Sequence, residues 1–165
     1  MTFRRSLAPV AFATAAALAL AACSAFQSKP AVTVSAKDVN VNARWHASIA
    51  SPAELAGVVQ MTGTASMTPG KKSGTTDLVL NIANAAPGGV HPWAVHLGQC
   101  GSDDGVYGVQ ANYPPLTIGS DGKGSSSATV ALDTPASGNY YVSVRASAAN
   151  GETIVACGNL AAPTQ

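Results

Sequence analysis

The chain has 165 residues, of which 47% are hydrophobic, and nine basic and eight acidic side chains give it a formal net charge of +1. Arg4 and Arg5 precede an uncharged run, rich in Ala and Leu, over residues 7–22. Without the first 22 residues, two of the nine basic side chains are lost, which leaves seven against eight acidic ones and a net charge of −1. This balance argues against a nucleic-acid partner and against attraction to an acidic membrane surface.

The N-terminal run predicts a secretory signal, because it follows a positive start and is too short and too small-sided for a good membrane span of ~20 strongly apolar residues. It ends in Leu20-Ala21-Ala22-Cys23, which resembles a bacterial lipobox. That resemblance implies cleavage before Cys23, a lipid such as palmitate on this cysteine, and attachment to a membrane through it. The alternative is an ordinary secretory signal that happens to contain a cysteine.

We therefore predict a lipoprotein signal peptide over residues 1–22 and an exported protein of the bacterial cell envelope. By analogy with lipoproteins, Ser24 after the cysteine favours the outer membrane if the cell has two membranes. Residues 23–40 are small, polar and weakly patterned, and we expect them to form a flexible tether. Residues 41–165 are then enough for one domain with one modest core.

Two cysteines, Cys100 and Cys157, remain once Cys23 carries the lipid. An even pair in an oxidising compartment predicts a disulfide bond. In the chain-entropy model, such a bridge would stabilise the fold by about 4 kcal/mol.

Alternation of apolar and polar residues dominates the predicted domain, and no segment has the period of a helix. The alternation predicts strands over residues 44–49, 59–67, 78–82, 93–97, 127–132 and 140–147. Turn sequences separate these runs, namely Pro69-Gly70, Pro87-Gly88-Gly89, Asp121-Gly122, Ser137-Gly138 and Asn150-Gly151. Short strands joined by such turns predict an all-β fold, an antiparallel sandwich or barrel.

Residues 98–116 have little alternation and are predicted to be a long loop, which Cys100 would tie down. Asp103 and Asp104 could contact calcium, but two adjacent carboxylates without further spaced oxygens favour a solvated loop tip. Trp93 and Tyr140 are predicted to pack in the core.

One constellation resembles a known family. His91-Pro-Trp-Ala-Val-His96 is followed by Cys100 and, near the C-terminus, by Ile154-Val-Ala-Cys157-Gly158. The copper/zinc superoxide dismutase family similarly has a His-Gly-Phe-His-Val-His strand and a cysteine that pairs with a second one in Arg-Leu-Ala-Cys-Gly. The resemblance covers residues 41–162 and implies a Greek-key β-barrel.

The same resemblance implies that the copper site has lost its ligands. The three copper-ligand positions match Ala94, which has no donor atom, His96, which is retained, and Arg145, whose guanidinium stays protonated. The arginine that attracts the anionic substrate in the family matches Ile154, and residues 98–116 contain no histidine for a zinc site. Because redox copper needs several imidazoles in a fixed geometry, we expect no cofactor and no catalysis. Copper or zinc at His96 is the alternative.

The chain has three histidines. His91 and His96 are five positions apart on one predicted strand, so they should point to opposite faces and cannot chelate one ion together. His91 is predicted to be a structural, hydrogen-bonding residue. His96 is predicted to be an ordinary surface histidine, with a weak metal or anion contact as the alternative. His46 is predicted to be solvated.

These features favour a non-catalytic binding or structural protein, anchored by lipid, with an unidentified protein or small-anion partner and with homodimerisation left open. One alternative is an active, copper-binding superoxide dismutase. Another is a metal-carrying envelope protein that uses His96 together with a partner subunit. The stretch from Gly138 to Glu152 also resembles the chordin-type (CHRD) domain, an all-β module, which is the second family to consider.

Overall fold

A computed structural model describes residues 44–55, 57–102 and 104–163, all of which belong to a compact unit spanning Val34–Gln165. The predicted signal peptide, the tether, Cys23 and Asp103 lie outside the described residues. No helix within those ranges is both long and apolar enough to cross a membrane.

The described residues form strands and two short 3-10 helices, η1 (Ala53–Leu55) and η2 (Gln110–Asn112). The strands are β1 (Trp45–Ala50), β2 (Thr62–Pro69), β3 (Thr76–Ala83), β4 (Val90–His91), β5 (Trp93–Leu97), β6 (Leu116–Thr117), β7 (Gly124–Val130), β8 (Tyr140–Arg145) and β9 (Ile154–Leu160). The all-β class predicted from the alternation is confirmed.

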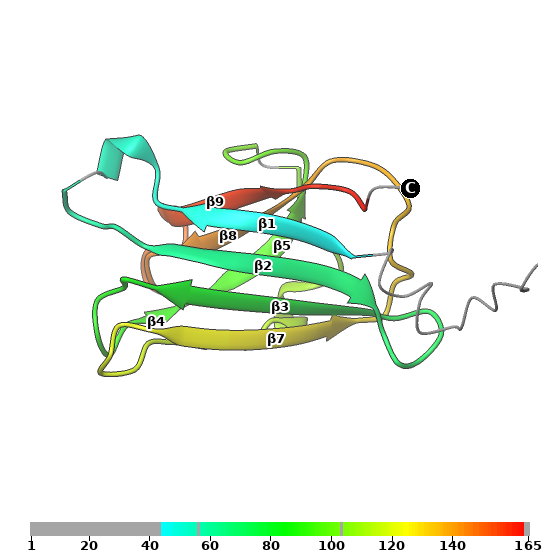
Figure 1. Cartoon of the computed structure of the whole chain (residues 1–165), viewed down its shortest axis with the longest axis horizontal. Helices are drawn as coiled ribbons and strands as arrows, with labels where there is room; N and C mark the ends of the chain where they lie inside the picture. The colour runs from blue at the N-terminus through cyan, green and yellow to red at the C-terminus, as the bar shows by residue number, and fades with distance from the viewer. Residues whose placement is uncertain (1–43, 56, 103, 164–165) are drawn as a thin grey trace, which may run out of the picture. The chain divides into compact units, whose positions relative to one another are not determined.

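Seven of these strands form one antiparallel sheet in the order β5-β8-β9-β1-β2-β3-β7, and β4 pairs separately with β6. The neighbours β1 and β9, β3 and β7, and β5 and β8 are far apart in the sequence, so the sheet is not a simple meander. The sheet curls into a half-barrel, in which β5 passes behind β1, β2 and β3 (Figure 1). The predicted antiparallel barrel or sandwich architecture is confirmed.

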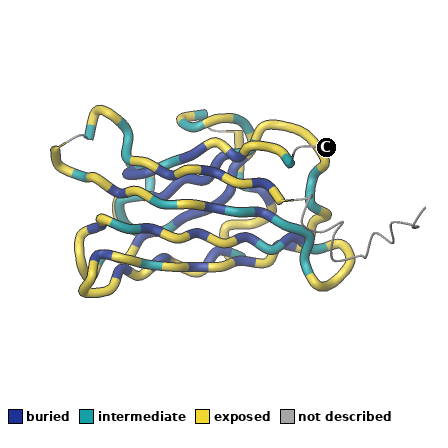
Figure 2. The backbone as a smooth tube through the Cα atoms, in the orientation of Figure 1, coloured by how far each residue is buried: buried dark blue, intermediate teal, exposed yellow. Residues whose placement is uncertain are grey.

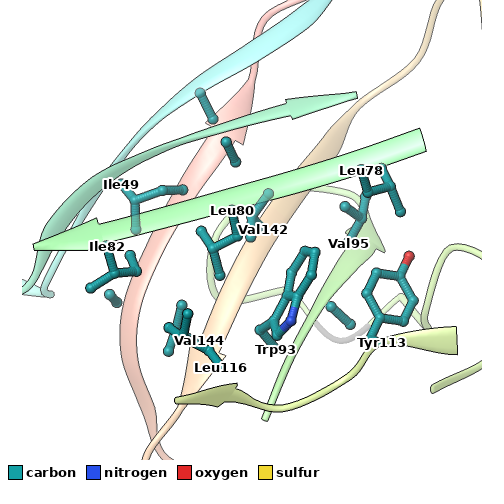
Figure 3. Close-up of a cluster of buried hydrophobic side chains, with 14 of the residues drawn as sticks. Ile49, Leu78, Leu80, Ile82, Trp93, Val95, Tyr113, Leu116, Val142 and Val144 are labelled. Carbon is teal, nitrogen blue, oxygen red and sulfur yellow. The ribbon is translucent and has the colours of Figure 1, made fainter. Parts of the chain in front are cut away.

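The alternation in the sequence decides which side chains enter the core. In β1, Trp45, Ala47 and Ile49 are buried while the residues between them, His46 included, are exposed. This alternation of buried and exposed positions continues along the neighbouring strands (Figure 2). The inward side chains meet in one cluster inside the curled sheet (Figure 3), which includes Leu78, Leu80, Ile82, Trp93, Val95, Tyr113, Leu116, Val142 and Val144.

Several strand boundaries differ from the prediction, for local reasons. β2 begins at Thr62, and Val59 lies in the preceding connection. β7 ends at Val130, after which Leu132 is 43% exposed. β8 ends at a bulge between Val144 and Arg145, two residues earlier than expected. β9 was not predicted from alternation, because the adjacent Val155 and Ala156 are both buried.

The predicted long loop turns back along β5, the strand at one end of the sheet order. The Leu97 amide donates to the Gly105 carbonyl at 3.0 Å, and the Tyr107 amide donates to the Val95 carbonyl at 2.8 Å. The predicted disulfide is present: Cys100 and Cys157 are bonded with their Cα atoms 6.0 Å apart and 57 positions apart in sequence. This bond fixes the start of the loop to β9.

Aromatic side chains join the loop to the core. The Trp93 indole donates to the Pro114 carbonyl at 2.8 Å and packs edge-on against Tyr113 with ring centroids 5.1 Å apart. Tyr140 packs edge-on against both Trp45 and Tyr107, at 5.4 and 5.6 Å. The predicted core role of Trp93 is confirmed, whereas Tyr140 is half-buried and packs against the core from its edge.

Candidate anion pocket beneath the long loop

A pocket of about 410 Å³ lies between β5, β8 and the long loop. Its walls include Ala94, His96, Ser143 and Arg145. Trp93 and Val95 of β5 enter the core, so Ala94 and His96, the alternate residues, belong to the opposite face of the strand. In the antiparallel register Ala94 lies opposite Ser143, and this pairing brings the β8 side chains to the same pocket. The pocket therefore contains all three positions that match copper ligands in the resemblance.

His96 is only 5% exposed, so the prediction of an ordinary surface histidine is wrong. Its Nε2 lies 2.9 Å from the Ser143 hydroxyl, and its ring stacks on Tyr141 with centroids 5.0 Å apart and planes 21° apart. The physical reason for the burial is the return of the loop, which brings Val106 into a β-bridge with His96. The Tyr141 hydroxyl also donates to the carbonyl of Ser102 in that loop.

Arg145 is half-buried at the end of β8, where the strand bulges. Its amide donates to the Pro92 carbonyl at 2.8 Å. Its Nη1 donates to the carbonyls of Gly151 and Glu152 at 2.9 and 3.4 Å. These contacts hold the guanidinium against the pocket wall. Because a guanidinium has five N–H donors, the group can also donate to a ligand.

Among the residues that the structure describes, the other charged side chain that lines the pocket is Glu152, which is exposed. Ile154, at the position of the family's anion-attracting arginine, lies opposite Arg145 in the register and is not part of the pocket lining. Among the described residues no group of three or more His, Cys, Asp or Glu side chains is placed to hold a metal ion.

His91 does not share a strand with His96, so that prediction is wrong: Pro92 separates β4, which ends at His91, from β5. His91 lines a second pocket. It is 8% exposed, and its Nδ1 lies 3.0 Å from the Arg145 carbonyl oxygen. This bond is of the structural kind predicted for His91. The two histidines therefore line different pockets, and Arg145 contributes its backbone to one and its side chain to the other.

Two residues that line the pocket were not singled out from the sequence: Ser143 and Gln110. The alternation in β8 already groups Ser143 with Arg145 on one face, so a signal for Ser143 was present. Gln110 lines the pocket from the long loop and donates through Nε2 to the Trp93 carbonyl at 3.1 Å. Nothing in the sequence pattern of the loop marks it.

Comparison with known proteins finds no protein-family model that matches the chain and no match among curated proteins. What the pocket can bind therefore follows from the chemistry of its own residues.

Proposed function

We propose that this chain is an exported, lipid-anchored β-barrel protein of the bacterial cell envelope that binds a small anion without catalysing a reaction. In this proposal the pocket corresponds to the copper site of the superoxide dismutase family after the loss of its ligands. The observation that carries the proposal is the guanidinium of Arg145 at the wall of a half-open pocket, beside Ala94 and the buried His96.

The donor set of the pocket does not fit copper. Ala94 has no lone pair to give, and the permanently protonated Arg145 has none either. His96 is the one imidazole in the pocket, and its Nε2 already lies at hydrogen-bonding distance from Ser143. One imidazole and one exposed carboxylate, that of Glu152, beside a fixed positive charge make a poor site for redox copper, which needs several imidazoles in a defined geometry.

The same charge favours an anion. A guanidinium beside a partly desolvated pocket attracts a negative group more strongly than it would in bulk water, and charge-assisted hydrogen bonds are stronger than neutral ones. The carboxylate of Glu152 lines the same pocket and opposes this attraction. The balance favours a small, singly charged anion that can contact Arg145 while remaining away from Glu152.

Formate is a suitable probe, and its binding is measured by the shift of the His96 and Arg145 side-chain resonances during a titration. Arg145→Gln should weaken binding about tenfold, because it removes a charged hydrogen-bond partner. Glu152→Gln should tighten binding, because it removes the opposing charge. Arg44→Gln, at an exposed arginine outside the pocket, serves as the matched control. Equal affinity in all four proteins, or no saturable binding, contradicts an anion site.

Copper is tested separately by equilibrium dialysis followed by elemental analysis. We expect negligible copper in the unmodified protein and a superoxide dismutation rate no faster than the buffer blank. Ala94→His combined with Arg145→His should raise copper affinity, because it restores two imidazoles near His96. Stoichiometric tight copper in the unmodified protein, or a dismutation rate that disappears in His96→Ala, would instead support the dismutase or the metal-carrier alternative.

The lipid anchor is tested by mass spectrometry of the native protein from membranes. The expected mature chain begins at Cys23 and carries added acyl mass. A soluble form cut at another position would refute the anchor while leaving the anion pocket untouched.

A further inference from the structure

The second pocket, which His91 lines, has a volume of about 540 Å³. Its wall gathers residues from the β1–β2 connection, from the segment after β3, from β4, from the position after β8 and from β9. The β1–β2 connection and the segment after β3 lie at the same end of the sheet (Figure 1). Apolar side chains dominate its wall, including Val58, Val59, Met61, Ala85, Ala146 and Val155. Val58 is 86% exposed, so apolar surface extends to the outside. A volume of this size is within the range of small-molecule sites.

His91 gives this wall one buried polar group of defined character. Its Nδ1 faces the carbonyl oxygen of Arg145, which can only accept, so Nδ1 carries the proton. In the neutral ring, Nε2 then presents a lone pair. Nε2 is buried and has no hydrogen-bond partner among the described residues. An unsatisfied buried polar atom destabilises a fold, so its presence calls for an explanation.

Gly89 lies close beside this atom. A Cβ at position 89 would lie 2.5 Å from His91 Nε2, which is too close for an ordinary contact. The absence of a side chain at Gly89 therefore allows the imidazole to occupy this position, and a larger residue would displace it.

We infer that this second pocket binds a small uncharged molecule with an apolar body and one hydroxyl group, which donates a hydrogen bond to His91 Nε2. A metal ion does not fit, because among the described residues the pocket wall offers one imidazole and no carboxylate or thiolate. A charged ligand does not fit either, because no charged side chain from the described part of the chain lines the wall to compensate for its desolvation. This inference does not depend on the anion pocket.

The test compares 2-naphthol with 2-methoxynaphthalene, which has the same apolar body but no donor. Both are titrated into the full chain and followed through the methionine methyl resonances. The Met61 methyl should move, because Met61 lines the pocket, while the Met67 methyl, buried at the other end of β2, should not. Naphthol should bind about three- to tenfold more tightly than the ether, as expected for one hydrogen bond.

Two variants locate the acceptor. His91→Asn retains an amide that can donate to the Arg145 carbonyl but removes Nε2, so the preference for naphthol should disappear. His46→Asn makes the same change at an exposed histidine and should keep the preference. If His91→Asn does not fold, Gly89→Ala should abolish the preference by placing a methyl group beside Nε2. Equal affinities for the two probes in the unmodified chain, equal shifts of both methionines, or a preference that survives in the folded variants would overturn the inference.

Discussion

Removal of the Cys100–Cys157 bond should lower the free energy of unfolding by a large fraction. The bond closes a loop of 57 positions in the unfolded chain. In the chain-entropy model, freeing a loop of this length costs about 4 kcal/mol, against a typical unfolding free energy of about 5–15 kcal/mol for a domain. The double change Cys100→Ser with Cys157→Ser is the direct perturbation.

The native structure should survive this change, because other contacts still hold the loop. The Leu97–Gly105 and Tyr107–Val95 backbone bonds remain, as does the bond from the Cys100 amide to the Asn159 side chain at 2.8 Å. The loss of stability should therefore come from the greater entropy of the unfolded chain. We expect a lower urea midpoint together with an unchanged near-ultraviolet spectrum in buffer.

Urea denaturation followed by tryptophan fluorescence measures the effect, because Trp45 and Trp93 are both buried. Parent and variant both carry Cys23→Ser, so that Cys100 and Cys157 are the only cysteines that differ between them. We expect a loss of about 2–4 kcal/mol in the unfolding free energy. A loss below about 1 kcal/mol would refute the entropic reasoning, and two free thiols in the unfolded, unreduced parent would refute the bond itself.

Three further predictions concern the core and its backbone. Leu80→Ala should reduce the unfolding free energy by about 2–5 kcal/mol in a urea titration, whereas Val79→Ala, on the opposite face of β3, should have little effect. Gly158→Ala should also destabilise in the same assay, because its Cβ would lie 2.1 Å from a carbonyl oxygen of β1. Desolvation by burial raises the pKa of the Tyr107 and Tyr113 hydroxyls above 10.0 in the folded state. As the pH rises, the unfolded chain therefore loses these protons at a lower pH than the folded chain does. Their contribution to stability should be complete below about pH 10 and lost as the pH rises further, with tyrosinate absorbance appearing together with unfolding.

Much of the fold could be predicted from the sequence, because the strands with one buried face alternate clearly. β1 and β3 show this, since Trp45 and Leu80 lie inward and the residues beside them lie outward. β9 could not be found in this way, because the adjacent residues Val155 and Ala156 are both buried although they belong to opposite faces of the strand. Alternation reports burial on a single face and gives no signal for a strand covered on both.

The site was harder to predict, because a loop without any pattern determines its burial. The sequence placed Ala94, His96 and Arg145 together through the resemblance, and the structure brings them to one pocket. The burial of His96 depends on the path of residues 98–116 over β5, which is set by tertiary contacts and the disulfide. No local preference of His96 itself carries that information.

The path of this loop also bears on how folded copies of the chain behave toward one another. An edge strand with free N–H and C=O groups is a template on which another chain can add a strand, and so a starting point for aggregation. Here the Leu97 amide and the Val95 carbonyl at the β5 edge are already occupied from within the same molecule. These bonds come from the backbone of the loop itself and do not depend on the disulfide. Folded molecules with reduced cysteines should therefore associate through β5 no more readily than oxidised ones.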